Sequence, residues 1–307
     1  MTTHRTEFWS RYHRLRDIDD TSEVRLIEAN AADGARVVVY EVEHSDRVPS
    51  AVLSRALHEV NRLAAVAEDS LLRPIEVATS ESFSRIVCPV PGYERLTDRL
   101  RAGLPILETL GIARSLLKVL DNIHRSGLVL RCLCAKDIYL HSTEDTMQAV
   151  IGGCPPLMLL DTFGGHISAG EILTYAAPET LGALDYDIKA PADLYSLGII
   201  LFECLTGEPP FTGETSRELL FHHVTTPVPV LCQLNEQIPP PLSDIVRRML
   251  QKHPRDRYQS SAGVLFDIDQ VAAAFLNREF VRPAAPMVLG TKDQRESLIE
   301  PAHVGRD

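Results

Sequence analysis

The first part of the chain alternates short β-branched runs with turns, which is the pattern of antiparallel strands. Residues 24–43 read VRLIEANAADGARVVVYEVE, two such runs around an Asn, Ala, Asp and Gly turn, and predict a hairpin. Over residues 51–66 the apolar positions recur three and four residues apart, the period of an amphipathic helix. RPIEVATS and FSRIVCPV predict two more strands before Pro and Gly at residues 89–92 interrupt the pattern. A small sheet-rich unit is therefore expected to end near residue 90.

The pattern after residue 90 is helical. An apolar stripe from Ile106 to Ile123 predicts a helix that ends at Ser126 and Gly127. Residues 192–206 are apolar on nearly every face but too few to span a membrane, so they predict a helix buried at the centre of a helical lobe. PLSDIVRRMLQK and SAGVLFDIDQVAAAF predict later helices. Past residue 280 sustained periodicity ends, as in a linker or tail.

Composition narrows the class of protein. A chain of 307 residues with 45% hydrophobic content can form one large domain or two lobes around a cleft. The net charge of −11 argues against nucleic acid as a partner, because basic side chains supply that attraction. No apolar run approaches the roughly 18 residues of a membrane span, and the first residues are too polar for a secretory signal. We therefore expect a cytoplasmic protein.

Three motifs in the second half of the chain stand in a characteristic order. The sequence reads APE from Ala177, DLYSLGIILFECLTGEPPF from Asp193, and HPRDRYQS around Arg257. With these motifs the chain resembles the eukaryotic-like Ser/Thr protein kinases over roughly residues 20–275. The resemblance implies that Glu179 pairs with Arg257 and that Asp193 braces the catalytic loop. It also implies an α+β bilobal protein-kinase-like fold, with an N-terminal extension (1–20), a β-rich N-lobe (21–90), a helical C-lobe (91–278) and a linker or tail (279–307).

The N-lobe departs from the kinase pattern at the positions that bind the nucleotide phosphates. In the family a lysine on the third strand holds the α and β phosphates and pairs with a glutamate on the first helix. The matching position is Tyr40, and the first lysine of the chain is Lys118. Glu59 matches the partner glutamate, either in that role or as an ordinary polar-face residue. Gly34 alone lies near the expected glycine-rich loop, and a single glycine in a hairpin favours a turn over a phosphate cradle.

The catalytic loop departs as well. Leu130-Arg131-Cys132 stands where the family has His-Arg-Asp, so the base that accepts the substrate proton is replaced by Cys132. Cys134 replaces the catalytic-loop lysine of the family. Asp137 takes the place of the metal-binding asparagine and keeps an oxygen donor.

The metal-binding DFG motif of the family is matched by Asp161-Thr162-Phe163-Gly164, after the apolar run LMLL. Asp161 is a candidate metal ligand with Asp137, and a helix-capping or turn role is the alternative. Counting back from Ala177 puts Ile172 at the threonine position that helps link the catalytic aspartate to the peptide-binding loop. Both partners of that link are therefore replaced.

These positions predict a catalytically impaired kinase, a pseudokinase acting as a regulatory or protein-interaction module in signalling. No cofactor is required in that role. The alternatives are a Ser/Thr protein kinase with full or residual activity on ATP, and a nucleotide-binding switch that holds ATP weakly with Mg²⁺ through the two aspartates. The expected partner is another protein or an adjacent signalling domain. The tail, VLGTKDQRESLIEPAHVGRD, resembles the linker that joins a kinase-like domain to an AAA-type ATPase region in some large multidomain bacterial signalling proteins.

Overall fold

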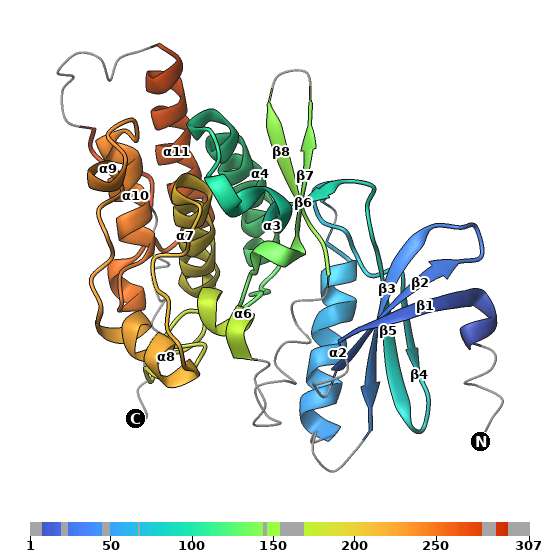
Figure 1. Ribbon diagram of the computed structural model, residues 1–307. Helices are drawn as coiled ribbons and strands as arrows, with labels where there is room; N and C mark the ends of the chain where they lie inside the picture. Colours follow the sequence, from blue (N-terminus) through green and yellow to red (C-terminus); the bar gives the residue numbers. More distant parts are fainter. Residues whose placement is uncertain are drawn as a thin grey trace, which may run out of the picture.

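The computed structural model describes residues 8–19, 24–44, 50–66, 68–143, 146–153, 169–277 and 287–293. Its described part has two lobes (Figure 1), one built on a twisted sheet with a single long helix and the other on packed helices. The predicted α+β, kinase-like bilobal fold is confirmed by this architecture.

The N-lobe contains a five-stranded antiparallel sheet in the order β1-β2-β3-β5-β4. Its strands are β1 (Tyr12–Asp19), β2 (Val24–Ala31), β3 (Arg36–Glu43), β4 (Glu76–Thr79) and β5 (Phe83–Pro89). The predicted hairpin is β2–β3, in register from Val24 opposite Val42 to Asn30 opposite Arg36. The sheet begins at Tyr12, inside the segment that the sequence assigned to an N-terminal extension, because β1 pairs with β2 along its length.

The two faces of the sheet bury different partners, as the two-residue period of a strand requires. Helix α2 (Ser50–Ala64) covers one face. Phe8 and Tyr12 close a second cluster on the other face with Ile27 and Val87. That face also buries an ion pair in which Arg85 Nε lies 2.6 Å from Glu41 Oε2, under the ring of Phe8. Phe8, which precedes β1, therefore contributes to the N-lobe core.

The C-lobe follows the connection at residues 89–92 and contains a small sheet and a helical bundle. The sheet has the order β6-β7-β8, with strands β6 (Glu94–Arg95), β7 (Ile138–Ser142) and β8 (Met147–Ile151). The helices are α3 (Leu96–Arg99), α4 (Ile106–Arg125), α6 (Ala169–Tyr175), α7 (Ala190–Thr206), α8 (Ser216–Thr225), α9 (Leu231–Leu234), α10 (Pro240–Met249) and α11 (Ser261–Leu276), with 3₁₀ turns η1 (Leu100–Ala102), η2 (Ala135–Asp137) and η4 (Pro254–Asp256).

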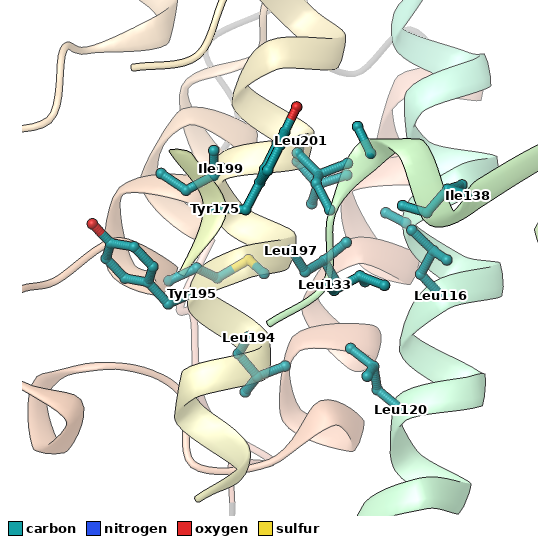
Figure 2. Packing of buried hydrophobic residues seen from close by; sticks show 14 of the residues in the cluster. Leu116, Leu120, Leu133, Ile138, Tyr175, Leu194, Tyr195, Leu197, Ile199 and Leu201 are labelled. Carbon is teal, nitrogen blue, oxygen red and sulfur yellow. The ribbon is translucent and has the colours of Figure 1, made fainter. Parts of the chain in front are cut away.

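Helix α7 is the centre of the C-lobe, as its all-round apolar sequence predicts. Figure 2 shows Leu194 and Leu197 of α7 directed toward α4 and the loop that carries Leu133. Gly198 allows α10 to approach closely, because a Cβ there would lie 3.0 Å from the Cβ of Met249. In the part of the chain that the structure describes, no helix is both long and apolar enough to cross a membrane.

Candidate functional site

A buried carboxylate on α7 binds the backbone of residues 130 and 131, in the segment that matches the catalytic loop. Asp193 accepts hydrogen bonds from the backbone N–H groups of Leu130 and Arg131, at 2.9 and 2.7 Å. His124 Nε2 donates to the same carboxylate at 2.8 Å, and its Nδ1 lies within hydrogen-bond distance of Ser261 Oγ, at 3.0 Å. These bonds fix Arg131 at a φ of +72°, a conformation that costs a non-glycine residue free energy. His124 and Ser261 were not identified from the sequence.

A second buried contact joins Glu179 to Arg257. The two guanidinium Nη atoms of Arg257 donate to the two carboxylate oxygens of Glu179, at 2.7 and 2.9 Å. The guanidinium also donates to the carbonyls of Pro191, Gln251 and Lys252, so the buried charge has hydrogen-bond acceptors on several sides. This forked geometry is the strong form of an arginine–carboxylate pair. It ties the APE segment to the chain that follows α10.

Tyr40 lies on β3 between Leu26 of β2 and Ile86 of β5. Its ring packs against the cluster beneath α2, and its hydroxyl lies beside Gly153, just after β8. A Cβ built on Gly153 would lie 2.9 Å from both Tyr40 Oη and Asp137 Oδ1. Tyr40, Asp137 and Gly153 therefore converge where the two lobes face each other.

Glu59 is paired across the lobes with Arg131. Arg131 Nη2 donates to Glu59 Oε1 at 2.8 Å, and Arg55 Nε donates to the same oxygen at 3.3 Å. Burial opposes ionisation of Glu59, but the two arginines outweigh it and lower the pKa of this carboxyl group. Glu59, which the sequence predicts to match the family's partner glutamate, is thus an anion held by the Arg131 guanidinium.

Cys132 and Cys134 are buried together beneath that loop. Their sulfur atoms lie 3.6 Å apart, and Cys132 Sγ also lies 3.9 Å from the backbone carbonyl of Ile172. Cys132 is 2% exposed. The hydrogen bond with Cys132, together with burial, raises the pKa of the Cys134 thiol. A buried thiol with a raised pKa is a poor nucleophile, so Cys134 is chemically inert.

The two candidate metal ligands differ in what the structure says of them. Asp137 ends η2, and its carbonyl accepts the N–H of Gly152 at 2.7 Å. The strand that pairs with β7 ends at Ile151, and Gly152 and Gly153 follow it beside Asp137. Asp161 and the LMLL run before it lie outside the described residues, so a metal site shared by Asp137 and Asp161 stays a prediction.

Gly34 lies in the tight turn between β2 and β3, where its N–H donates to the carbonyl of Ala31 at 2.9 Å. Its φ is +86°, and nothing lies within 4 Å of the position a Cβ would take. The turn conformation therefore accounts for this glycine. The other connection before β3, residues 20–23, reads DTSE, with two acidic residues and no glycine. Neither connection has the sequence G-x-G-x-x-G.

The connection between the lobes reads Pro89-Val90-Pro91. The two prolines have no N–H group. The remaining N–H, that of Val90, donates to the carbonyl of Arg36 at 2.9 Å. Residues 89–91 therefore have no backbone N–H group left to donate to a ligand.

Comparison with known proteins agrees with this fold. The family model described as protein kinase domain matches residues 21–266, and the chain belongs to this family. It is 25% identical over 222 residues to a probable serine/threonine-protein kinase of Clostridium perfringens, covering 72% of this chain and 32% of that protein. It is 26% identical over 263 residues to the DNA damage-responsive serine/threonine-protein kinase RqkA of Deinococcus radiodurans, covering 83% of this chain and 38% of that protein.

Two further matches differ in how much of this chain they cover. The chain is 41% identical over 95 residues to hybrid signal transduction histidine kinase G of Dictyostelium discoideum, which covers 31% of this chain and 3% of that protein. The crystal structure of Rad53 1-466 in complex with AMP-PNP matches with a TM-score of 0.64 and 17% identity, over 84% of this chain and 65% of that one. This match shows the fold. The chain spans less than half the length of these three curated relatives.

Proposed function

We propose that this chain is a protein-kinase domain that does not transfer phosphate and acts as a regulatory or protein-interaction module in signalling. The observation that carries the proposal is the pairing of Glu59 with Arg131, while Tyr40 stands at the lysine position of β3. A kinase uses a lysine–glutamate pair there to hold the nucleotide phosphates. Here the carboxylate already has its cation, and the strand presents a tyrosine in place of the lysine.

The state of the base position supports the same proposal. A general base must lie within hydrogen-bond reach of the proton it takes, with a pKa suited to the task. Cys132 is buried against Cys134 and the carbonyl of Ile172 and offers a thiol in place of a carboxylate. Loss of a positioned base typically lowers the rate by roughly 10² to 10⁴.

The described residues also fit ATP and Mg²⁺ poorly. Tyr40 supplies no positive charge to the phosphates, and the connection at residues 89–91 has no unpaired N–H for a base. Asp137 is one carboxylate that a magnesium ion could use, and magnesium usually needs one or two together with the phosphates. Weak or absent nucleotide binding follows from this set of groups.

An active Ser/Thr protein kinase is the second candidate. The relatives from Clostridium perfringens and Deinococcus radiodurans are named as such kinases, and the C-lobe contacts made by Asp193, Glu179 and Arg257 are all present. Phosphoryl transfer depends mainly on positioning and electrostatics, so a differently built site is chemically conceivable. Such a site would need a cationic side chain to bind the phosphates and a general base, both from residues other than Tyr40 and Cys132.

A signalling partner or adjacent domain is part of the proposal. The likeness to a hybrid signal transduction histidine kinase supports it, because the matching stretch there is a small part of a much longer protein. The linker-like sequence after residue 287 supports it too. The cytoplasmic location predicted from the sequence stays a prediction.

Thermal unfolding with and without nucleotide tests the binding half of the proposal. The melting temperature should move by less than about 1 °C in millimolar ATP and Mg²⁺, because a ligand well below its Kd adds little stability. Asp137→Ala is the matched control. A rise of several degrees that Asp137→Ala removes would instead support a nucleotide-binding switch.

A further inference from the structure

The segment at residues 287–293 lies against the C-lobe, although its sequence reads as a linker. Met287 and Leu289 pack against the main hydrophobic core, whereas Val288 between them is 70% exposed. This alternation places one side of the segment on the protein and the other in solvent. Only some side chains of the segment therefore contact the C-lobe.

Asp293 makes the most specific contact of the segment. Its carboxylate accepts hydrogen bonds from the backbone N–H groups of Gln259 and Ser260, at 2.9 and 3.1 Å, and from Ser260 Oγ at 3.2 Å. Arg248 Nη2 donates to the other oxygen at 3.0 Å. The side chain of Asp293 is 3% exposed. These groups neutralise a buried carboxylate at the start of α11, where the helix dipole also favours an anion.

Gly290 makes the second specific contact. Its N–H donates to Asp267 Oδ2 at 2.7 Å, and its φ is +75°. A Cβ at this position would collide with the guanidinium of Arg248. The positive φ therefore favours glycine, and a larger residue would also have to displace the Arg248 guanidinium.

The receiving groups are held in place by the C-lobe itself. The guanidinium of Arg248 lies over the ring of Tyr258, 4.1 Å from its centroid, and Tyr258 Oη donates to Asp267 at 2.6 Å. Tyr258 and Asp267 are fully buried. A Cβ on Gly263 would lie 2.8 Å from the Cα of Asp293, so α11 also leaves room for the segment's backbone.

We propose that Arg248, Asp267 and the first turn of α11 form a docking site for a linear peptide, with residues 287–293 of the same chain as its occupant. The site selects a glycine followed three residues later by an aspartate. Docking holds residues 287–293 against α10 and α11. It thereby fixes the position from which a domain or partner connected through this segment would extend. This role does not depend on whether the domain transfers phosphate.

Hydrogen exchange on the whole chain tests whether the segment is docked. The amides of Gly290, Asp293, Gln259 and Ser260 should be protected in the wild type and equally in Lys292→Ala, which alters an exposed neighbour. In Asp293→Ala these amides should exchange at least about tenfold faster, while those of α7 stay unchanged. Equal protection in Asp293→Ala and wild type would overturn the proposal.

Peptide binding separates a docking site from a helix cap. A fluorescent peptide of residues 285–296 should bind the Asp293→Ala chain with a Kd below about 1 mM, because about 1 mM is the usual local concentration of a tethered segment. The same peptide should bind the wild-type chain more weakly, because the site there is already occupied. Peptides carrying Asp293→Ala or Gly290→Ala should not bind. Absence of binding to the Asp293→Ala chain would overturn the proposal. So would a wild-type dimer that Asp293→Ala dissociates, because the occupant would then come from a second copy.

Discussion

Arg131 Nη2 donates a hydrogen bond of 2.8 Å to Glu59 Oε1, and this contact joins the catalytic loop of the C-lobe to α2 of the N-lobe. The side chains of Arg131 and Glu59 are 13% and 12% exposed. Arg62 of the same helix donates to the carbonyls of Ser126 and Gly127, at the end of α4. Helix α2 is therefore tied to the C-lobe through Glu59 and Arg62, in addition to its packing on the N-lobe sheet.

Replacing Glu59 by Gln should destabilise the domain by about 1–3 kcal/mol at neutral pH, between the values for exposed and fully buried pairs. The pKa of Glu59 is lowered on folding from 4.5, so its contribution is complete above that pH and is lost as the pH falls through the folded pKa. Urea unfolding of wild type and Glu59→Gln should show the difference shrinking below pH 4.5. Arg247→Ala, in an exposed pair, should cost less than about 0.5 kcal/mol. A cost as small for Glu59→Gln would mean that the contact does not hold α2.

Loss of the buried Arg257 charge should be more damaging. Arg257→Ala leaves Glu179 buried without its cation, which typically costs about 3–5 kcal/mol. Arg257→Lys keeps the charge but cannot reproduce the forked bonds, so it should fall between wild type and alanine. The midpoint of urea unfolding measures both. Arg257→Lys unfolding at the wild-type midpoint would show that the forked geometry contributes no stability.

His223 should make the stability of the C-lobe depend on pH. Burial, with Lys252 and His222 nearby, lowers the pKa of His223 from 6.5 to about 3. Between those values the unfolded chain binds the proton and the folded chain does not, so this contribution is complete above pH 6.5 and lost as the pH falls below it. The slope should be at most about 1.4 kcal/mol per pH unit. His223→Gln should flatten unfolding free energy against pH in this window, and exposed His13→Gln should not. Identical slopes in both variants would contradict the account.

Helices α2, α4, α7, α10 and α11 and strands β2 to β5 could be predicted from the sequence because their apolar periods are regular, and α7 is the clearest example. Strand β1 was missed because half of YHRLRDID is charged, and because register shifts between Arg14 and Arg16 and between Asp17 and Asp19 break the two-residue period. The replacements at Tyr40 and Cys132 stay predictions, because they rest on the resemblance to the kinase pattern at those positions. The contact of Glu59 with Arg131 could not be predicted, because it joins residues 72 apart in separate lobes.

The docked segment shows the same limit. Asp293 looks like a solvated charge in a polar tail, and its partners at Arg248 and the start of α11 are 45 and 34 residues away. Only folding brings these donors together around one carboxylate. In the sequence, the docked segment shows only a glycine and an aspartate three residues apart, and this pair is common in turns.

The most direct test is transfer of the γ-phosphate of labelled ATP, with Mg²⁺ or Mn²⁺, to the chain itself and to a generic protein substrate. The account predicts labelling of the wild type no higher than in reactions without the protein, and no change in Asp137→Ala or Asp161→Ala. Labelling well above that background in the wild type, lost in either aspartate variant, would show a working kinase and contradict the account.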